Sequence, residues 1–244
     1  MHAGFAFTSP QCSSVPSVVK KTVANGIKSL FLDGPAGRLE ALLNEGQPDA
    51  THAAVVCHPH PLFGGTMHNK VVYHAMKALS GFGFPVLRFN FRGAGMSEGE
   101  HDKGHGEQGD VRAAIDWLAA AYPLPLLFCG FSFGAATGLR AVCTDERVAG
   151  LIALGTPVGV EGRVYTYQFL KDCTRPKLFV SGSRDQYGPP ASLRKVAELT
   201  PEPKEVVIVE GGDHFFEGHL AEMQSAIQSW VGKYFKTGRQ AEAS

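Results

Sequence analysis

Short apolar runs alternate with longer segments of helical periodicity along most of this chain, and the alternation limits the possible fold more than any other feature. The expected strands cover residues 28–33, 38–44, 52–57, 84–91, 124–129, 148–154, 177–181 and 205–209. The expected helices cover residues 69–80, 107–122, 135–143, 191–199 and 218–235. A chain that returns to a strand after each helix forms a mostly parallel sheet with helices on both faces, so the predicted class is α/β.

The first two strands differ from the rest because a short turn, Gly34-Pro35-Ala36-Gly37, joins them directly. Glycine and proline favour a tight reversal, which predicts an antiparallel hairpin at one edge of the sheet. Elsewhere the strands are expected to be parallel, and open parallel sheets bind ligands beyond the carboxyl ends of their strands. The loops that follow the strands are therefore where functional residues are expected.

The 244 residues are enough to bury one large core, and we expect a single domain over residues 19–236. Residues 1–18 are rich in Ser and Pro and lack the cationic start and long apolar run of a signal peptide, so a loosely ordered tail is expected there. Residues 237–244 are expected to form a second tail. No apolar stretch approaches the ~18 residues that a membrane span requires.

The charge and the cysteines narrow the class of protein further. Lys and Arg together number 23, as do Asp and Glu, so no overall field attracts nucleic acid or an anionic membrane surface. The five cysteines contain no C-x-x-C pair, and Cys57 and Cys129 sit inside apolar runs where buried thiols are expected. Free thiols fit a reducing compartment, so a cytoplasmic location is expected.

One turn between a strand and a helix has the spacing of a reactive serine. The apolar run that ends at Cys129 continues into Gly130-Phe131-Ser132-Phe133-Gly134 and then into a helical segment. A sharp turn of this kind crowds the backbone, and a Cβ atom at Gly130 or Gly134 would clash with it. The pentapeptide alone is weak evidence, because a serine at a glycine-rich turn can simply cap the helix that follows.

Three further loops carry polar residues just beyond a strand. His58-Pro59-His60-Pro61 follows the third expected strand, Asp185 follows the seventh and His214 follows the last. Together with Ser132 after the fifth strand, these residues come in the chain order serine, acid, histidine that accompanies the strand-turn-serine arrangement.

On these motifs the chain resembles the α/β-hydrolase serine hydrolases over about residues 30–235. It is similar to small bacterial esterase-like and dienelactone-hydrolase-like members without a large cap domain. Only about twenty residues, Thr156 to Pro176, separate the sixth and seventh strands, where larger relatives insert a lid. The resemblance therefore implies an open pocket that takes small or short-acyl esters.

The resemblance also implies a role for each residue of the serine, acid and histidine set. Ser132 would be the nucleophile, and His214 the base that removes the serine proton. Asp185 would orient His214 and stabilise its charged form. Asp213 is the nearest competitor for this role, but it adjoins His214, and neighbouring side chains in an extended loop diverge.

An oxyanion hole requires two backbone N–H donors. Phe133, at the start of the helix, would supply one of them. Alignment with the family's usual His-Gly-x motif places His60 at the second position, and Leu62 is the alternative because Pro59 and Pro61 have no N–H. Proline stands here where the family commonly has glycine, which implies a stiffer loop.

Aromatic residues near these loops are candidate walls of the substrate pocket, although core positions are equally compatible with the sequence. The candidates are Phe63, Phe131, Tyr165, Tyr167 and Phe216. The glycine-rich segment Arg92 to Ser97 is expected to form a tight turn near the oxyanion loop. His101 and His105, in the polar loop beyond it, are expected to be exposed at the surface.

Neither a metal nor another cofactor is expected. No His-Glu-x-x-His occurs, and His58-x-His60 lacks the Asp-His pair that follows it in metallo-hydrolases. No G-x-G-x-x-G follows the first strand, which argues against a dinucleotide fold.

The sequence thus predicts a carboxylesterase of the EC 3.1.1 type that acts on a small-molecule ester through an acyl-enzyme on Ser132. A thioesterase, a peptidase, a lactone or dienelactone hydrolase and a haloperoxidase-like perhydrolase would use the same residues. Dienelactone hydrolases typically have cysteine where this chain has serine. A catalytically idle protein of this fold that binds a ligand or partner is the alternative from another class. The sequence leaves the oligomeric state open.

Overall fold

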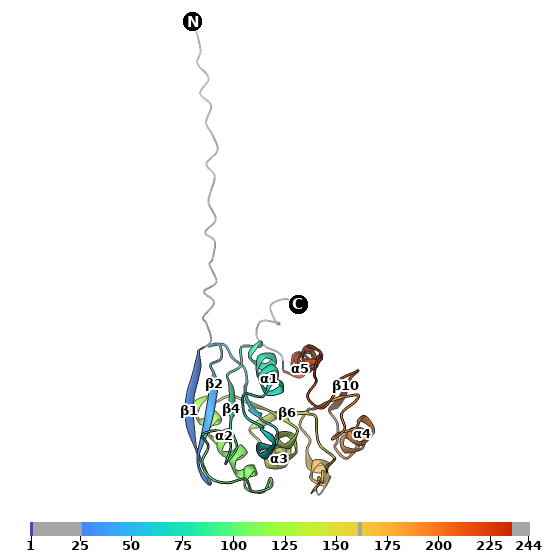
Figure 1. Ribbon diagram of the computed structural model, residues 1–244. Coiled ribbons are helices and arrows are strands. Elements are labelled where there is room, and N and C mark those ends of the chain that lie inside the picture. Colours follow the sequence, from blue (N-terminus) through green and yellow to red (C-terminus); the bar gives the residue numbers. More distant parts are fainter. Residues whose placement is uncertain (2–25, 161–162, 236–244) are drawn as a thin grey trace.

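The computed structural model describes Met1 and residues 26–160 and 163–235, so the expected tails 1–18, apart from Met1, and 237–244 lie outside the described residues (Figure 1). One sheet of eight strands has the order β1-β2-β4-β3-β5-β6-β9-β10. Its strands are β1 (Ile27–Gly34), β2 (Gly37–Asn44), β3 (Ala53–Cys57), β4 (Val86–Phe89), β5 (Leu126–Phe131), β6 (Val148–Leu154), β9 (Lys177–Gly182) and β10 (Lys204–Val209). The helices are α1 (Lys70–Ser80), α2 (Glu107–Ala121), α3 (Phe133–Val142), α4 (Pro190–Glu198) and α5 (Leu220–Tyr234).

The sheet is antiparallel at one edge and parallel elsewhere. β1 pairs with β2, and β2 with β4, in antiparallel register. β4, β3, β5, β6, β9 and β10 then pair in parallel, each with the next. The carboxyl ends of these six strands therefore lie along one edge of the sheet. The predicted hairpin at the sheet edge and the mostly parallel sheet are both confirmed.

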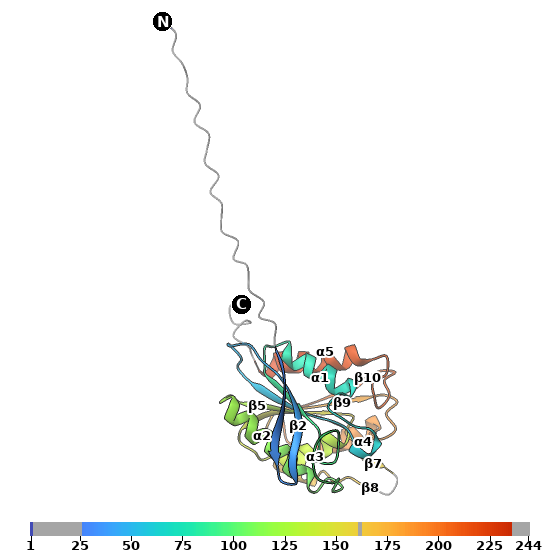
Figure 2. The same ribbon diagram turned by 60° about the vertical axis from the view of Figure 1, so that its left-hand side comes forward.

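Helices cover both faces of the sheet. In Figure 2, α1 and α5 lie above the sheet, while α2 and α3 lie below it. Strand residues alternate between the two layers: Val55 and Phe128 pack with α2 and α3, whereas Val56 and Leu127 pack with α1 and α5. β3 and β5 are buried along their whole length, because helices cover both of their faces.

The connection between β6 and β9 is short, as the sequence predicted. It holds a two-stranded ribbon of β7 (Gly159–Val160) and β8 (Arg163–Val164) and one 3₁₀ segment, η2 (Gln168–Asp172). No large cap domain occupies this place in the described residues. Another predicted element is shorter than expected, since the strand predicted over 84–91 is regular only from Val86 to Phe89.

Cys57 and Cys129 are fully buried free thiols, as predicted. Burial raises the pKa of both thiols, so they remain protonated and act as small apolar side chains. None of the helices in the described part of the chain is long and apolar enough to cross a membrane.

Candidate active site

Ser132 lies in the turn from β5 to α3, and its backbone is strained. Its φ is 54° and its ψ is −118°, in a region that a residue with a Cβ rarely adopts. Close contacts on both sides enforce the turn. A Cβ at Gly130 would lie 2.6 Å from the Gly134 carbonyl oxygen, and one at Gly134 would lie 2.5 Å from that of His58. The predicted steric requirement for both glycines is therefore confirmed.

The three loops bring Ser132, His214 and Asp185 together, although these residues are far apart in sequence. His214 Nε2 lies 2.9 Å from Ser132 Oγ. His214 Nδ1 lies 2.9 and 3.0 Å from the two carboxylate oxygens of Asp185. A carboxylate can only accept, so Nδ1 carries the proton, and Nε2 presents its lone pair to the serine hydroxyl.

Asp185 is buried, and its carboxylate accepts several further hydrogen bonds. The Tyr187 and Gly188 N–H groups donate to Oδ1 at 2.8 and 3.0 Å, and the Ser181 hydroxyl donates to Oδ2 at 3.0 Å. Burial acts to raise the pKa of Asp185, but the hydrogen bond and charge of His214 and the two N–H groups outweigh it and lower the pKa. The carboxylate is therefore charged when it faces His214.

Aromatic rings surround the imidazole of His214. The ring centroid of Tyr187 lies 4.7 Å from that of His214, and those of Phe131 and Phe215 lie 5.2 Å from it. The His214 side chain is only 5% exposed. These rings limit the movement of the imidazole, so packing as well as hydrogen bonding fixes its orientation.

The loop after β3 places His60 beside the start of α3. The His60 and Phe133 rings lie 4.9 Å apart, and both residues line the cavity that contains Ser132 and His214. Phe133 is the first residue of α3, and the first N–H groups of a helix have no acceptor within it. The Leu62 N–H, which the sequence offered as the alternative donor for an oxyanion hole, donates instead to His60 Nδ1 at 3.3 Å.

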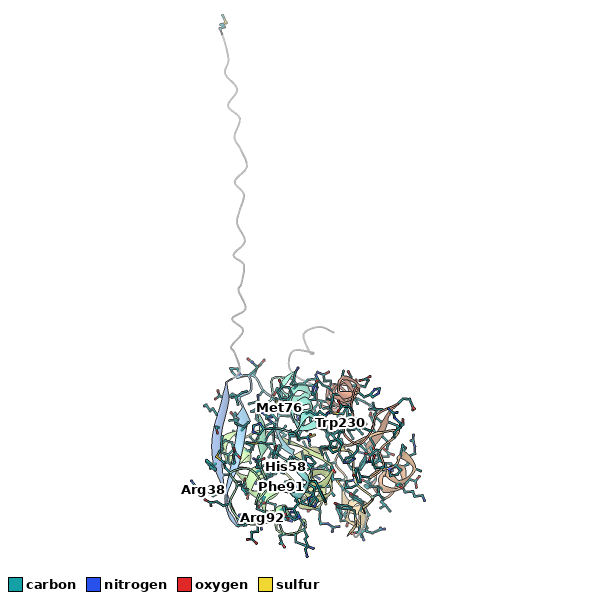
Figure 3. The ribbon with its side chains drawn as sticks, viewed as in Figure 1. Arg38, His58, Met76, Phe91, Arg92 and Trp230 are labelled. Atoms are coloured by element: carbon teal, nitrogen blue, oxygen red, sulfur yellow. The ribbon has the colours of Figure 1, made fainter. Side chains whose placement is uncertain are left out.

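His58 supports this loop from the interior. Its Nδ1 donates to the Pro59 carbonyl at 2.6 Å, and its Nε2 accepts the Phe91 N–H at 2.9 Å. Figure 3 shows His58 and Phe91 close together inside the molecule, and their ring centroids are 4.8 Å apart. Burial lowers the pKa of His58 to about 4, so the ring is neutral and joins the loop after β3 to Phe91, just beyond β4.

We expect His58→Gln to weaken the dependence of stability on acid pH. The folded pKa of about 4 lies below the unfolded value of about 6.5, so between them the unfolded chain binds more protons. The stability that His58 contributes is fully present at a pH above its unfolded pKa. It is lost as the pH falls through its folded pKa, and the total loss is about 3 kcal/mol.

Urea unfolding of the unmodified protein and of His58→Gln at about pH 7 and about pH 4.5 checks this expectation. The difference in unfolding free energy between the two proteins should be about 2 kcal/mol smaller at the lower pH. The glutamine oxygen can still accept the Phe91 N–H, which limits other damage. A gap that stays constant with pH would contradict a neutral His58.

Buried ionic groups hold the glycine-rich loop after β4. Arg92 forms an ion pair with Asp110 at 2.6 Å and donates to the Gly106 carbonyl at 2.7 Å. Ser97 donates to the Asn90 carbonyl at 2.7 Å, which closes the tight turn predicted for this segment.

The prediction of an exposed His101 is wrong, whereas His105 is exposed as expected. The His101 side chain is 7% exposed, and its Nδ1 lies 2.6 Å from Glu107 Oε1. Its ring packs against those of His60 and Phe133. A charged partner at the start of α2 draws His101 inward, which a polar loop sequence does not reveal. In the described residues, no group of three or more His, Cys, Asp or Glu side chains could hold a metal ion.

The cavity beside Ser132 has a volume of about 400 Å³. Two of the five predicted wall residues, Phe63 and Tyr165, line it, and Phe63 is 84% exposed at the rim. Phe131 and Phe216 do not line it, because both are fully buried in the core between the sheet and α5. Tyr167 does not line it either, since its hydroxyl donates to the Pro157 carbonyl at 2.6 Å and its ring lines a neighbouring cavity.

Two aromatic wall residues were not predicted from the sequence. Tyr187 and Phe215 both line the cavity, on either side of His214. Each lies within two positions of a predicted functional residue, Asp185 or His214, and that proximity was the available signal.

Comparisons with known proteins agree with this fold. The model of the α/β-hydrolase domain family matches residues 52–232. An uncharacterized protein from Rickettsia prowazekii is 34% identical over 209 residues, which cover 83% of this chain and 87% of that protein. The fold and the family match together define an α/β hydrolase.

Two solved structures are also similar. A serine hydrolase without a lid from Xanthomonas campestris is 35% identical, with a TM-score of 0.75 over 86% of this chain and 95% of that one. A serine hydrolase homologue from Coxiella burnetii is also 35% identical, with a TM-score of 0.76 over 83% of this chain and 96% of that one. This chain therefore belongs to the α/β-hydrolase family, and the predicted fold class is confirmed.

Proposed function

We propose that this protein is a serine hydrolase that cleaves small or short-acyl carboxylic esters through an acyl-enzyme on Ser132. One observation carries the proposal above the others: the hydrogen-bonded series from Ser132 Oγ through His214 to Asp185 at the end of a strained strand-to-helix turn. The similarity to serine hydrolases without a lid supports it.

In the first step Ser132 Oγ attacks the ester carbonyl carbon. A serine hydroxyl is a weak nucleophile, so His214 Nε2 takes its proton as the new C–O bond forms. The resulting imidazolium faces the charged Asp185 carboxylate, which stabilises it and keeps Nε2 directed at the substrate. His214 then gives the proton to the departing alcohol as the ester C–O bond breaks.

The carbonyl oxygen gains negative charge during the attack. The backbone N–H groups of Phe133 and His60 are proposed to receive it, since both residues line the Ser132 cavity and Phe133 begins a helix. Each such donor typically contributes 10²–10³-fold to kcat, or about 3–4 kcal/mol. Water completes the cycle by the same steps, with His214 acting again as base, and releases the acid from Ser132.

The shape of the cavity supports a small substrate. A volume of about 400 Å³ accommodates a short acyl chain and a modest alcohol, and the lining is mostly aromatic and apolar. Esters are favoured over amides because a weakly basic alcohol leaves without the strong protonation that an amine requires.

A panel of p-nitrophenyl esters of increasing acyl length, run beside thioester and amide substrates, tests the proposal. We expect the short esters to have the highest kcat/KM, and a fluorophosphonate probe followed by mass mapping to place its adduct on Ser132. Higher kcat/KM for thioesters or amides would reassign the substrate class, and a protein with no turnover and no labelling would be a binding protein of this fold.

A further inference from the structure

A second cavity, of about 850 Å³, adjoins the one beside Ser132. The two cavities share two wall residues, Phe133 and Tyr165. The loop before α2, the outer side of α3 and the segment around Tyr165 form the rest of the wall of the larger cavity. A single elongated molecule with its ester bond at Ser132 could therefore extend from one cavity into the other.

The larger cavity is positively charged, although the whole chain carries no net charge. Lys103 and Arg140 line it, and none of the described residues in its wall is Asp or Glu. Within the described parts of the chain, no carboxylate oxygen lies within 4.0 Å of the Lys103 or Arg140 nitrogens. Protein carboxylates thus do not neutralise these two charges at close range.

Neutral groups hold Arg140 in place. Its Nη2 donates to the Thr166 carbonyl at 2.7 Å and to the Thr166 hydroxyl at 3.0 Å. Its guanidinium also lies over the Phe169 ring, 4.4 Å from the ring centre. These contacts fix the position of the guanidinium and leave its positive charge available to a ligand, since a guanidinium matches carboxylate and phosphate oxygens.

The loop that carries Lys103 is also fixed. Glu107, buried at the start of α2, accepts the N–H groups of Asp102 and Gly104 at 2.8 Å each. Asp102 in turn accepts the Gly106 N–H at 2.9 Å. The residues on both sides of Lys103 are thereby held against α2, so the loop keeps Lys103 at the cavity wall.

We infer that the larger cavity is a subsite for an anionic group of the substrate. The preferred esters therefore carry a carboxylate or phosphate at the far end of their acyl chain, away from the ester bond. This inference rests on the proposed esterase function. Lys103 and Arg140 bind the anion, and the apolar part of the substrate passes Phe133 and Tyr165. The cavity is open to water, so the binding is sensitive to salt.

Three matched p-nitrophenyl esters test this subsite. They have the same acyl length and end in a carboxylate, a phosphate or a neutral carboxamide. We expect KM for a charged ester to be about tenfold lower than for the neutral one, and the better of the two anions identifies the group. Raising the salt from about 0.05 M to about 0.5 M should raise KM for the charged esters alone.

The variant K103Q/R140Q removes both charges, and the variant R194Q/K195Q removes two exposed charges of α4 outside both cavities. The first should lose the tenfold preference, because KM for the charged ester rises to that for the neutral one, while the second should keep the preference. Equal KM values for charged and neutral esters in the unmodified protein would overturn the subsite. An equal change in KM for the charged and the neutral esters in K103Q/R140Q would also overturn it.

The same preparations separate this inference from the proposed function. Turnover of the neutral ester and fluorophosphonate labelling of Ser132 report the hydrolase directly, and they also show that each variant is folded. If both are present without a preference for charged esters, only the subsite is wrong. If both are absent from the unmodified protein, the proposed function fails first and the inference fails with it.

Discussion

Ser132→Ala is expected to lower kcat for a short p-nitrophenyl ester by about 10⁴–10⁶-fold and to abolish fluorophosphonate labelling. Alanine removes Oγ, the atom that lies 2.9 Å from His214 Nε2, and it keeps the backbone of the turn. The residual rate should come from substrate binding and the two proposed backbone donors, which would act while a water molecule attacks.

Stopped assays over hours measure this residual rate, and mass mapping follows the label. Ser80→Ala is a suitable control, because Ser80 ends α1 and lines neither cavity. The control should retain full turnover and labelling. Labelling that persists in Ser132→Ala would place the nucleophile elsewhere, and near-normal turnover would exclude an acyl-enzyme on this residue.

Asp185→Asn is expected to lower kcat by about 10⁴-fold while the protein remains folded. The asparagine amide can turn its NH₂ group towards His214 Nδ1, which then has to accept. The imidazole proton moves to Nε2, and Nε2 can no longer take the proton of Ser132. The fall in kcat therefore comes from the wrong tautomer of His214 and not from a displaced imidazole ring.

Asp213→Asn is the matched control, since it makes the same chemical change one residue from His214. Asp213 Oδ1 accepts the N–H groups of Phe215 and Glu217 at 3.0 and 2.9 Å, and an asparagine oxygen can do the same. We expect a change within about threefold. Thermal unfolding of both variants checks that they are folded, and equal losses of kcat would contradict a special role for Asp185.

Much of the fold could be predicted because it follows from local patterns. The buried runs of β3 and β5, the turn at Gly34 to Gly37 and the helical spacing of α1 each fix one element. Parallel pairing then brings the carboxyl ends of separate strands to one edge of the sheet. That is why three polar residues spread over 83 positions, from Ser132 to His214, could be expected to meet.

The pocket walls could not be predicted as well, because the direction of a loop side chain depends on local backbone angles that the sequence pattern does not reveal. Phe215 lines the cavity, whereas Phe216 has a φ of 53° and is buried in the core. No pattern in the sequence distinguishes these adjacent phenylalanines. The cationic cavity is hidden for another reason, since Lys103 and Arg140 come from a loop and a helix that only the folded chain places together.

The backbone angle of Ser132 lowers stability at the same residue that the proposed activity requires. A non-glycine residue at a φ of 54° costs about 1–2 kcal/mol, and glycine would adopt the same angle without that cost. The most stable residue at the turn is thus one that has no hydroxyl. A screen of variants for heat resistance alone would favour the loss of the serine, so any engineering of this chain needs an assay for turnover at each round.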